Sequence, residues 1–385
     1  MPALATRVAM RMHGFNRSPN TFTMVTDPET HEPGSQFETV RSVRSDRLLR
    51  ALTPFHRLVV VSHVNPDPDS LASMLGLKAL IESCQQGKPV TLTVDGMIAR
   101  AENRAMVEMI PISLVPVETA SVDAETAVIM VDSQPYTGRR FSEELAPQVV
   151  IDHHKTGGDL NGVIFQDIRD HLGATSTMVT GYLIEQKVLV SPELATALLY
   201  GIESETMGYP REASTLDDGA LVWLFPRANK DLLARIRNPK LPQSHFATFQ
   251  NSLVNAFLYR DLIVSWCGEV SQPDIIAEIA DFFIRFDQVN WALAIGLFDG
   301  GIKLSLRTAG LGGRAGEVLR QVLSGLGNAG GHDKRAGGMI ALADRDPATV
   351  DPVLRLVRHR LLDQLHIDEH QGRRLLNGGS VIQAP

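Results

Sequence analysis

The chain has 385 residues, of which 44% are hydrophobic and 21% charged, and its formal net charge at pH 7 is −7. This length allows two domains with sizeable cores, and the negative charge argues against a protein that coats long nucleic acid through many Lys and Arg contacts. The apolar runs fall short of the ~20 residues that span a bilayer, no signal-peptide segment follows Met1, and the two cysteines do not make a disulfide framework. We therefore expect a cytoplasmic protein without a membrane partner.

The chain opens with a segment that predicts no regular structure. Residues 1–35 are rich in Thr, Pro, Asn and Gly and show no periodicity, so we expect a flexible arm. Residues 36–52 follow with the spacing of an amphipathic helix, whose arginines, among them Arg44 and Arg47, form a charged face toward solvent. A small basic footprint for a ligand is the alternative for these arginines.

Strands and helices then alternate to about residue 223, which is the pattern of a doubly wound, mainly parallel α/β sheet. Three apolar runs, at residues 58–61, 127–131 and 149–151, have strong β character. Each delivers polar residues just past its end, and the carboxyl ends of parallel strands share one crevice. The side chains expected to converge there are His63, Asp67, Asp69, Asp132, Asp152 and His153.

Carboxylates combined with imidazoles, without thiolates, favour Mn²⁺ or Mg²⁺ as the bound ion and, less exclusively, Co²⁺ or Zn²⁺. So many carboxylates around one point repel each other, and a pair of divalent cations would neutralise them. Two cations roughly 3.5–4 Å apart form the usual clamp for the attack of water on phosphorus. Phosphoester hydrolysis is therefore the chemistry that this ligand set favours.

A largely helical connector is expected at residues 233–260, marked by Asn238-Pro-Lys-Leu-Pro242. A second, smaller α/β domain follows at residues 261–365. Its predicted elements are strands at 262–267, 291–298 and 302–307 and helices at 275–286 and 350–365. The polar tail, residues 366–385, is predicted to be mobile.

Five motifs, in this order along the chain, resemble those of the DHH phosphoesterase superfamily in its DHH/DHHA1 branch. His63-x3-Asp67-x-Asp69 is similar to the first motif, Asp132 to the second, and Asp152-His153-His154 to the triplet that names the family. In the fourth motif, Gly201-Ile-Glu-Ser-Glu-Thr206 stands where the family has Gly-Ile-x-Ser/Thr-Asp-Thr. The fifth, Gly330-Gly-His-Asp-Lys-Arg-Ala-Gly-Gly338, is similar to the glycine-rich DHHA1 signature.

The resemblance covers roughly residues 55–345. It identifies residues 36–232 as a catalytic DHH domain and residues 261–365 as a DHHA1 substrate-binding domain. It also implies two metal sites that share one carboxylate and activate a water between them. The first site would be formed by His63, Asp67 and Asp132, and the second by Asp69, Asp132 and His153.

Three further residues receive roles from the resemblance. Asp152 would orient the imidazoles, as metal-bound histidines commonly require, and His154 would face the scissile phosphate. Glu205 would complete the second metal site, although it is a glutamate where the family has Asp, so its carboxylate is displaced by an extra methylene. Glu203, two residues earlier, is the weaker candidate for this role.

In the second domain, the resemblance places a substrate-binding face opposite the metals. Gly330 and Gly331 would allow the backbone to approach a phosphate closely, His332 would donate to it, and Arg307 would clamp it in a bidentate manner. Lys334 and Arg335 remain open between substrate contact and an exposed loop.

The sequence thus predicts a Mn²⁺-dependent phosphodiesterase that resembles the enzymes called nanoRNases and hydrolyses short RNA or DNA oligonucleotides or dinucleotides to mononucleotides. Mg²⁺ or Co²⁺ could replace Mn²⁺, long duplex nucleic acid is not an expected partner, and a homodimer is possible. The alternatives are a cyclic-dinucleotide phosphodiesterase, a 3′-phosphoadenosine 5′-phosphate phosphatase, a pyrophosphatase or polyphosphatase, a single-strand exonuclease, and a weakly catalytic protein that senses a nucleotide.

Overall fold

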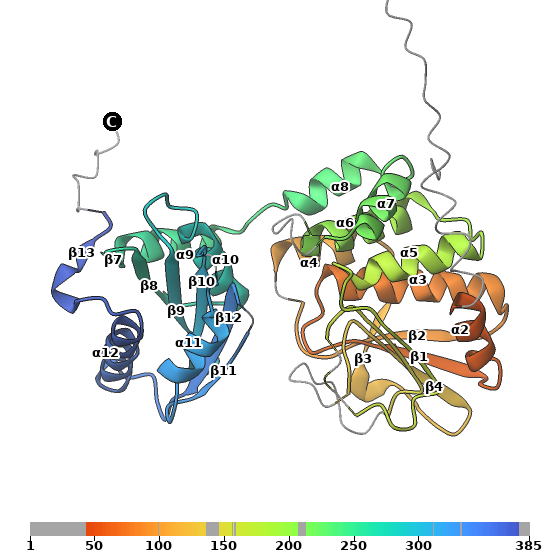
Figure 1. Cartoon of the computed structure of the whole chain (residues 1–385), viewed down its shortest axis with the longest axis horizontal. Helices are drawn as coiled ribbons and strands as arrows, with labels where there is room; N and C mark the ends of the chain where they lie inside the picture. Colours follow the sequence, from red (N-terminus) through yellow and green to blue (C-terminus); the bar gives the residue numbers. More distant parts are fainter. Residues whose placement is uncertain are drawn as a thin grey trace, which may run out of the picture.

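The structure is a computed structural model, and it describes residues 44–98, 100–135, 146–155, 157, 159–206, 213–310, 312–331 and 333–376. The predicted arm at residues 1–35 lies outside the described residues. Two α/β parts are each built around their own sheet (Figure 1). Residues 238–242 join helix α8 (Lys230–Arg237) of the first part to helix α9 (Gln243–Val254) of the second.

The first part contains a six-stranded, fully parallel sheet, which confirms the predicted mixed α/β class. Its strands are β1 (Arg57–Val61), β2 (Val90–Val94), β3 (Leu114–Pro116), β4 (Thr126–Val131), β5 (Val149–Asp152) and β6 (Phe165–Ile168). The helices described in this part, besides α8, are α2 (Arg44–Leu52), α3 (Pro68–Cys84), α4 (Ala101–Met109), the short η1 (Val117–Thr119), α5 (Thr175–Glu185), α6 (Pro192–Thr206) and α7 (Thr215–Leu224).

The strand order is β3-β2-β1-β4-β5-β6, so the chain changes direction across the sheet between β1 and β4. Ligands of open α/β sheets bind at such a switch point, outside the carboxyl ends of the strands. Strands β1, β4 and β5 coincide with the three apolar runs predicted from the sequence, and they are neighbours in the sheet. The topology therefore brings the three strand ends together.

Alternate residues of the strands supply two cores, one on each face of the sheet. Leu58, Val60, Ile129 and Ile151 belong to the larger core, which the helices cover (Figure 1). The smaller core on the other face contains Val59, Val61, Val128, Met130 and Val150 together with Val117 of η1. Burial on both faces explains why these strands are almost continuously apolar.

The second part contains a seven-stranded sheet of order β11-β12-β10-β9-β8-β7-β13, antiparallel except for the β8–β9 pair. The strands are β7 (Ala256–Tyr259), β8 (Leu262–Glu269), β9 (Trp291–Phe298), β10 (Gly301–Thr308), β11 (Asn328–Gly331), β12 (Arg335–Ala341) and β13 (Arg373–Arg374). The helices described with them, besides α9, are α10 (Asp274–Phe283), α11 (Ala315–Val322), α12 (Pro347–Gln364) and the short η2 (Glu369–Gln371).

Two assignments differ from the sequence prediction. The expected connector at residues 233–260 is divided, because strand β7 pairs with β8 and so belongs to the second sheet. The tail from residue 366 was predicted to be mobile, yet β13 pairs with β7, and the Leu375 amide donates to the Ala256 carbonyl (2.9 Å). A strand of two residues is too short to show a periodic pattern. Leu375 packs against the core that contains Ala256, a residue that lies far earlier in the chain.

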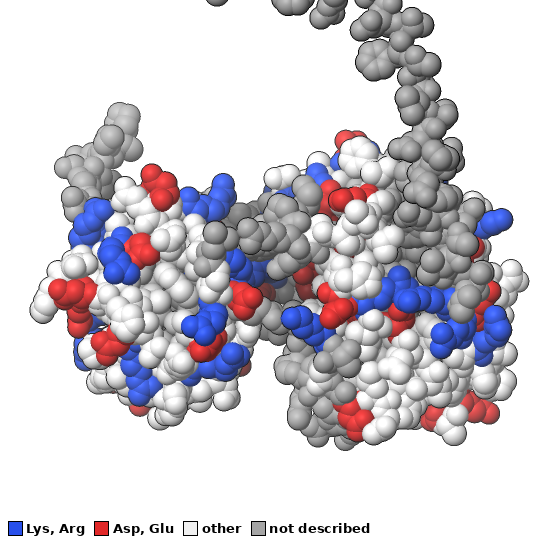
Figure 2. Space-filling view, viewed as in Figure 1, with Lys and Arg blue, Asp and Glu red and all other residues white. Residues whose placement is uncertain are grey.

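The two parts contact each other through α4. Arg104 donates a hydrogen bond to the Gln272 side chain (2.8 Å), just before α10 begins. Acidic and basic side chains are interspersed on the face of both parts that Figure 2 shows. No helix among the described ranges is both long and apolar enough to cross a membrane.

Candidate metal centre

The first group of candidate ligands follows β1. His63 lies two residues beyond the end of the strand and is buried. Asp67 is the N-cap of α3, where its carboxylate accepts a hydrogen bond from the Ser70 amide (3.0 Å) and Pro68 begins the helix. This cap holds Asp67 Oδ2 at 3.7 Å from His63 Nε2.

Asp132 lies at the centre of the cluster. It follows β4 directly, its backbone has a left-handed φ of 55°, and its side chain is 1% exposed. Its Oδ2 is 3.4 Å from His63 Nε2, and its Oδ1 is 3.4 Å from His153 Nε2. Left-handed conformations of residues other than glycine are uncommon and often mark functional sites. One carboxylate therefore meets imidazoles from two strand ends.

The residues of the Asp-His-His triplet have three different environments. His153 Nδ1 contacts the Leu172 carbonyl (3.2 Å), which leaves Nε2 directed at Asp132, as the imidazole of a metal ligand requires. His154 Nδ1 lies 2.8 Å from Oδ1 of Asp152. Asp152 contacts His154 with one oxygen, and the other accepts a hydrogen bond from Gln134 (2.7 Å).

Asp69 has a structural contact that the motif does not reveal. The residue is completely buried, and its two oxygens accept hydrogen bonds from the amides of Thr175 and Ser176, each at 2.7 Å. These amides begin α5, whose own N-cap residue, Ala174, provides no side-chain bond. Asp69 therefore caps α5 from a different helix, while its Oδ2 lies 3.9 Å from His153 Nε2.

The fourth motif lies at the end of α6. A Cβ at Gly201 would come within 2.6 Å of the Ser176 hydroxyl and 3.2 Å of the Pro68 carbonyl, so glycine is what lets α6 approach α3 and α5. Glu203 is paired with Arg237 through both carboxylate oxygens. The charge of Glu205, by contrast, acts on His153. Glu205 is thus the better candidate of the two glutamates.

The cluster has a surplus of negative charge. Burial by itself lowers the pKa of His63, but the hydrogen bonds and charges of Asp132 and Asp67 raise that pKa to about 10. Burial likewise lowers the pKa of His153, while Asp132, Asp69 and Glu205 raise it to about 10. In the absence of other cations, the carboxylates therefore keep both imidazoles protonated.

The donor set fits divalent cations. Carboxylate oxygens and imidazole nitrogens are common ligands of these ions. The positive charge of the cations would relieve the repulsion among the carboxylates. Two groups of potential ligand atoms each lie within 4.8 Å of one another: His63, Asp67 and Asp132, and Asp132, His153 and His154. Asp132 belongs to both groups.

These groups match the expected first site and differ from the expected second. Asp69 and Glu205 lie outside both groups of ligand atoms, so their roles as ligands stay predictions. His154 joins the second group, although its Nδ1 is 2.8 Å from Asp152 and 3.7 Å from Asp132.

Several buried polar residues make contacts in this centre that the sequence did not predict. The Ser70 hydroxyl donates to Asp132 Oδ2 (2.6 Å), and the Thr175 hydroxyl donates to Oδ1 (3.3 Å). Asp217 accepts hydrogen bonds from the Gly173 amide (2.9 Å) and the Thr177 hydroxyl (2.5 Å), which fixes the turn before α5. The position of Ser70 directly after Asp69 was the one feature of the sequence that could have indicated its role. The sequence around Asp217 contains no such indication.

The predicted substrate residues of the second part are only partly described. Gly330 and Gly331 lie in β11, whereas His332 lies outside the described residues. Arg307 was expected to clamp a phosphate in a bidentate manner, but its side chain is 6% exposed. It forms an ion pair with Asp281 of α10 (2.5 Å) and a hydrogen bond with Ser305 (2.8 Å). The partner helix lies distant in sequence, so the motif could not predict this contact.

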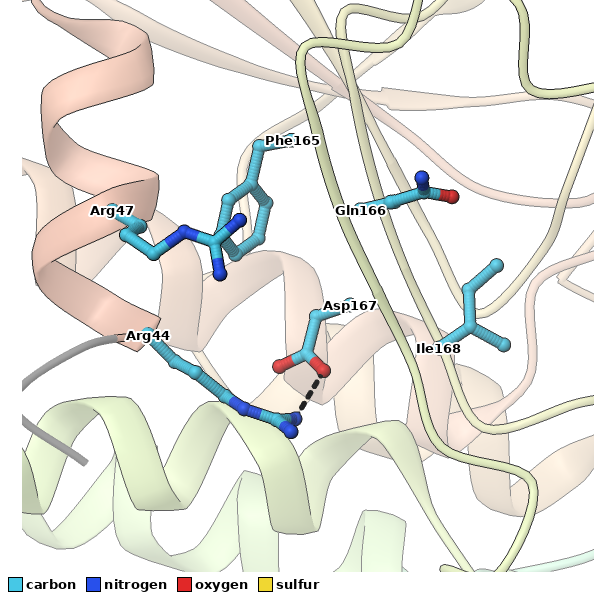
Figure 3. A pocket seen from close by; sticks show the side chains of 6 residues that line it. All are labelled: Arg44, Arg47, Phe165, Gln166, Asp167 and Ile168. Atoms are coloured by element: carbon cyan, nitrogen blue, oxygen red, sulfur yellow. Dashed lines mark hydrogen bonds and ion pairs between the residues drawn. The ribbon is translucent and has the colours of Figure 1, made fainter. Parts of the chain in front are cut away.

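A separate cavity of about 300 Å³ lies beside the edge strand β6, and its lining consists of Arg44, Arg47, Phe165, Gln166, Asp167 and Ile168 (Figure 3). Arg44 points to Asp167 and forms an ion pair with it (2.6 Å). Asp167 also pairs with Arg169 and accepts a hydrogen bond from Tyr182 (2.5 Å). Arg44 thus attaches α2 to the sheet edge, and none of the lining residues belongs to the two ligand groups.

Comparison with known proteins agrees with this geometry. Residues 57–202 match the model of the DHH family, N-terminal domain. An uncharacterized protein of Methanocaldococcus jannaschii is 30% identical over 321 residues, which are 82% of this chain and 65% of that protein. The chain thus spans just under two thirds of the length of that relative.

A Mycoplasma genitalium protein named bifunctional oligoribonuclease and PAP phosphatase NrnA is 22% identical over 312 residues, 76% of this chain and 91% of that protein. The crystal structure of an exopolyphosphatase-related protein from Bacteroides fragilis has the same fold, with a TM-score of 0.65 and 17% identity, over 83% of this chain and 95% of that one. The Asp-His-His triplet and both ligand groups lie within the residues that match the DHH family, N-terminal domain, so this part of the chain is a DHH-family domain.

Proposed function

We propose that this protein is a phosphodiesterase that uses two divalent cations, Mn²⁺ foremost, to hydrolyse short oligonucleotides and dinucleotides to mononucleotides. The observation that carries this proposal is the position of Asp132, which belongs to both ligand groups of a domain that matches the DHH family. A carboxylate shared in this way suits a clamp of two cations on a phosphoryl group. Bound there, the cations would activate water and neutralise charge on the phosphoryl oxygens.

The chain's own residues divide the remaining work. His63 and Asp67 would bind one cation, His153 would bind the other, and Asp132 would contact both. His154 belongs to the second ligand group, but we assign it to the phosphate, because its Nδ1 is engaged by Asp152 and its side chain is 27% exposed. Its Nε2 can then donate to a phosphoryl oxygen as charge develops there. Asp152 keeps that imidazole in place.

The preference for short substrates rests on charge and on the second part. The net charge is −7, so a long polyanion has little to bind outside a local site. Arg307 lies on β10 and pairs with Asp281 of α10. Helix α10 begins just after Gln272, which contacts α4 of the first part. A substrate phosphate could replace Asp281 as the partner of Arg307. The Mycoplasma relative is itself named an oligoribonuclease.

A product time course with Mn²⁺ tests the proposal. Oligonucleotides of two to five residues, a 24-mer and inorganic pyrophosphate are incubated in parallel, with EDTA and Asp132→Ala as controls. We expect mononucleotides from the short oligomers and little product from the others. Cleavage of the 24-mer at an equal rate, or turnover of pyrophosphate alone, would refute the assignment.

A second candidate is the hydrolysis of 3′-phosphoadenosine 5′-phosphate, which the name of the Mycoplasma relative favours. The same time course, extended to this compound and to cyclic dinucleotides, separates the possibilities by product. Glu205 in place of the family's Asp favours a third candidate, a sensor that binds nucleotides with little turnover. Tight binding of a dinucleotide to the Mn²⁺-loaded protein without any product would select this candidate.

A further inference from the structure

Each oxygen of Asp132 has the same two kinds of neighbour. Oδ2 accepts a hydrogen bond from the Ser70 hydroxyl (2.6 Å) and lies 3.4 Å from His63 Nε2. Oδ1 accepts one from the Thr175 hydroxyl (3.3 Å) and lies 3.4 Å from His153 Nε2. The carboxylate is thus held by one hydroxyl and one imidazole at each end.

Each of the two hydroxyls belongs to the first turn of a helix whose backbone is hydrogen-bonded to another candidate ligand. Ser70 lies in the first turn of α3, where its amide is bonded to Asp67, and Thr175 is the first residue of α5, where its amide is bonded to Asp69. Both side chains are completely buried. Each hydroxyl therefore approaches Asp132 from a helix start that another candidate ligand already fixes.

We propose that Ser70 and Thr175 are positioning residues, whose hydroxyls hold the Asp132 carboxylate so that one oxygen serves each candidate metal site. The inference rests on the proposed two-cation function. A cation needs the imidazole lone pairs of His63 and His153, so its binding removes these imidazoles as partners of Asp132. Of the hydrogen bonds described for this carboxylate, those from the two hydroxyls then remain to orient it, and their effect appears when metal is bound.

The variants Ser70→Ala and Thr175→Val remove the hydroxyls, and Thr175→Ser keeps one at the same position. Their matched controls are Ser73→Ala on α3 and Thr180→Val on α5. Ser73 and Thr180 are equally buried, but the hydrogen bonds described for their hydroxyls are to Ser176 (3.3 and 2.7 Å). The controls therefore remove a buried hydroxyl from the same two helices without touching Asp132.

The affinity and stoichiometry for Mn²⁺ are measured by titration calorimetry on the full chain without substrate, and the melting temperature is measured on the metal-free protein. We expect Ser70→Ala and Thr175→Val to weaken Mn²⁺ binding by roughly 10–100-fold, the usual cost of losing a residue that orients a metal ligand. Thr175→Ser and both controls should bind like the wild-type protein. The melting temperature of metal-free Thr175→Val should match that of Thr180→Val.

Two results would overturn the proposal: wild-type Mn²⁺ affinity in both hydroxyl-deletion variants, or an equal loss of affinity in the controls. If Ser70→Ala does not fold, the comparison of Thr175→Val with Thr175→Ser decides the question. Because binding is measured without substrate, a wild-type protein that binds Mn²⁺ but hydrolyses no oligonucleotide would refute the proposed function alone.

Discussion

The two ligand groups of the metal centre are built in different ways. His63 and Asp67 lie within five residues of each other, and a helix cap of the same segment fixes their spacing. The second group depends on a contact between more distant parts of the chain, because the Leu172 carbonyl, 19 residues beyond His153, orients that imidazole. The difference teaches that one site is organised locally and the other by tertiary packing. We therefore expect the first cation to bind more tightly than the second.

The largest expected effect comes from removing what both groups share. Asp132→Asn takes away the common charge, so both cations should be lost and kcat should fall by at least about 10³-fold, because the cations supply most of the charge stabilisation. Calorimetry with Mn²⁺ and the oligonucleotide assay measure the two effects. Asp170→Asn, an exposed aspartate in the loop before α5, is the control. Retention of one tight Mn²⁺ site in Asp132→Asn would show that the groups are independent.

The dependence on pH tests whether each group carries a proton before it binds metal. The pKa values of His63 and His153 are raised from 6.5 to about 10. The contacts of the two protonated imidazoles with the carboxylates therefore stabilise the metal-free protein fully below pH 6.5, and this stabilisation is lost as the pH rises through 10. Each cation must then displace a proton, and its affinity should rise about tenfold per pH unit between these limits.

Calorimetry in two buffers of different ionisation enthalpy counts the protons released. Release of two protons per two Mn²⁺ ions is expected. A single proton would assign the effect to one group only, and no release would contradict the charge balance described for the site.

A smaller effect should separate the second group from the first. Glu205→Gln removes a charge that acts on His153, and it should weaken only the second cation, by about fivefold, as expected for one partly screened charge. Glu203→Gln, two residues earlier on α6, breaks the pair with Arg237 instead and should leave Mn²⁺ binding unchanged. Equal effects of the two variants would show that the position of α6, and not the charge of Glu205, determines the affinity.

The smallest effect is expected outside both groups. Arg307→Ala should raise KM by about tenfold with little change in kcat, if a charge-assisted contact to the substrate phosphate is lost. Asp281→Asn breaks the same ion pair but keeps the arginine, and its KM should not rise. A parallel rise of KM in both variants would give Arg307 a purely structural role.

The sequence was sufficient for the strands and for the residues that directly follow them. Buried parallel strands are apolar runs, and their ends meet by topology, so His63, Asp132 and His153 could be brought together without coordinates. The contacts of Thr175 and Asp217 could not be predicted, because helix packing creates them over 43 and 44 residues. The pairing of Arg307 with Asp281 and that of β13 with β7 could not be predicted either, because both join elements that are distant in the sequence.

The capping of α5 by Asp69 has a consequence for how the protein matures. The start of a helix carries a partial positive charge, and together with two protonated imidazoles it offsets part of the negative charge of the buried carboxylates from within the chain. We therefore expect the domain to fold before it binds metal. The polypeptide can complete its fold first and load its ions afterwards, and a chelator should leave it inactive but folded and ready for reconstitution.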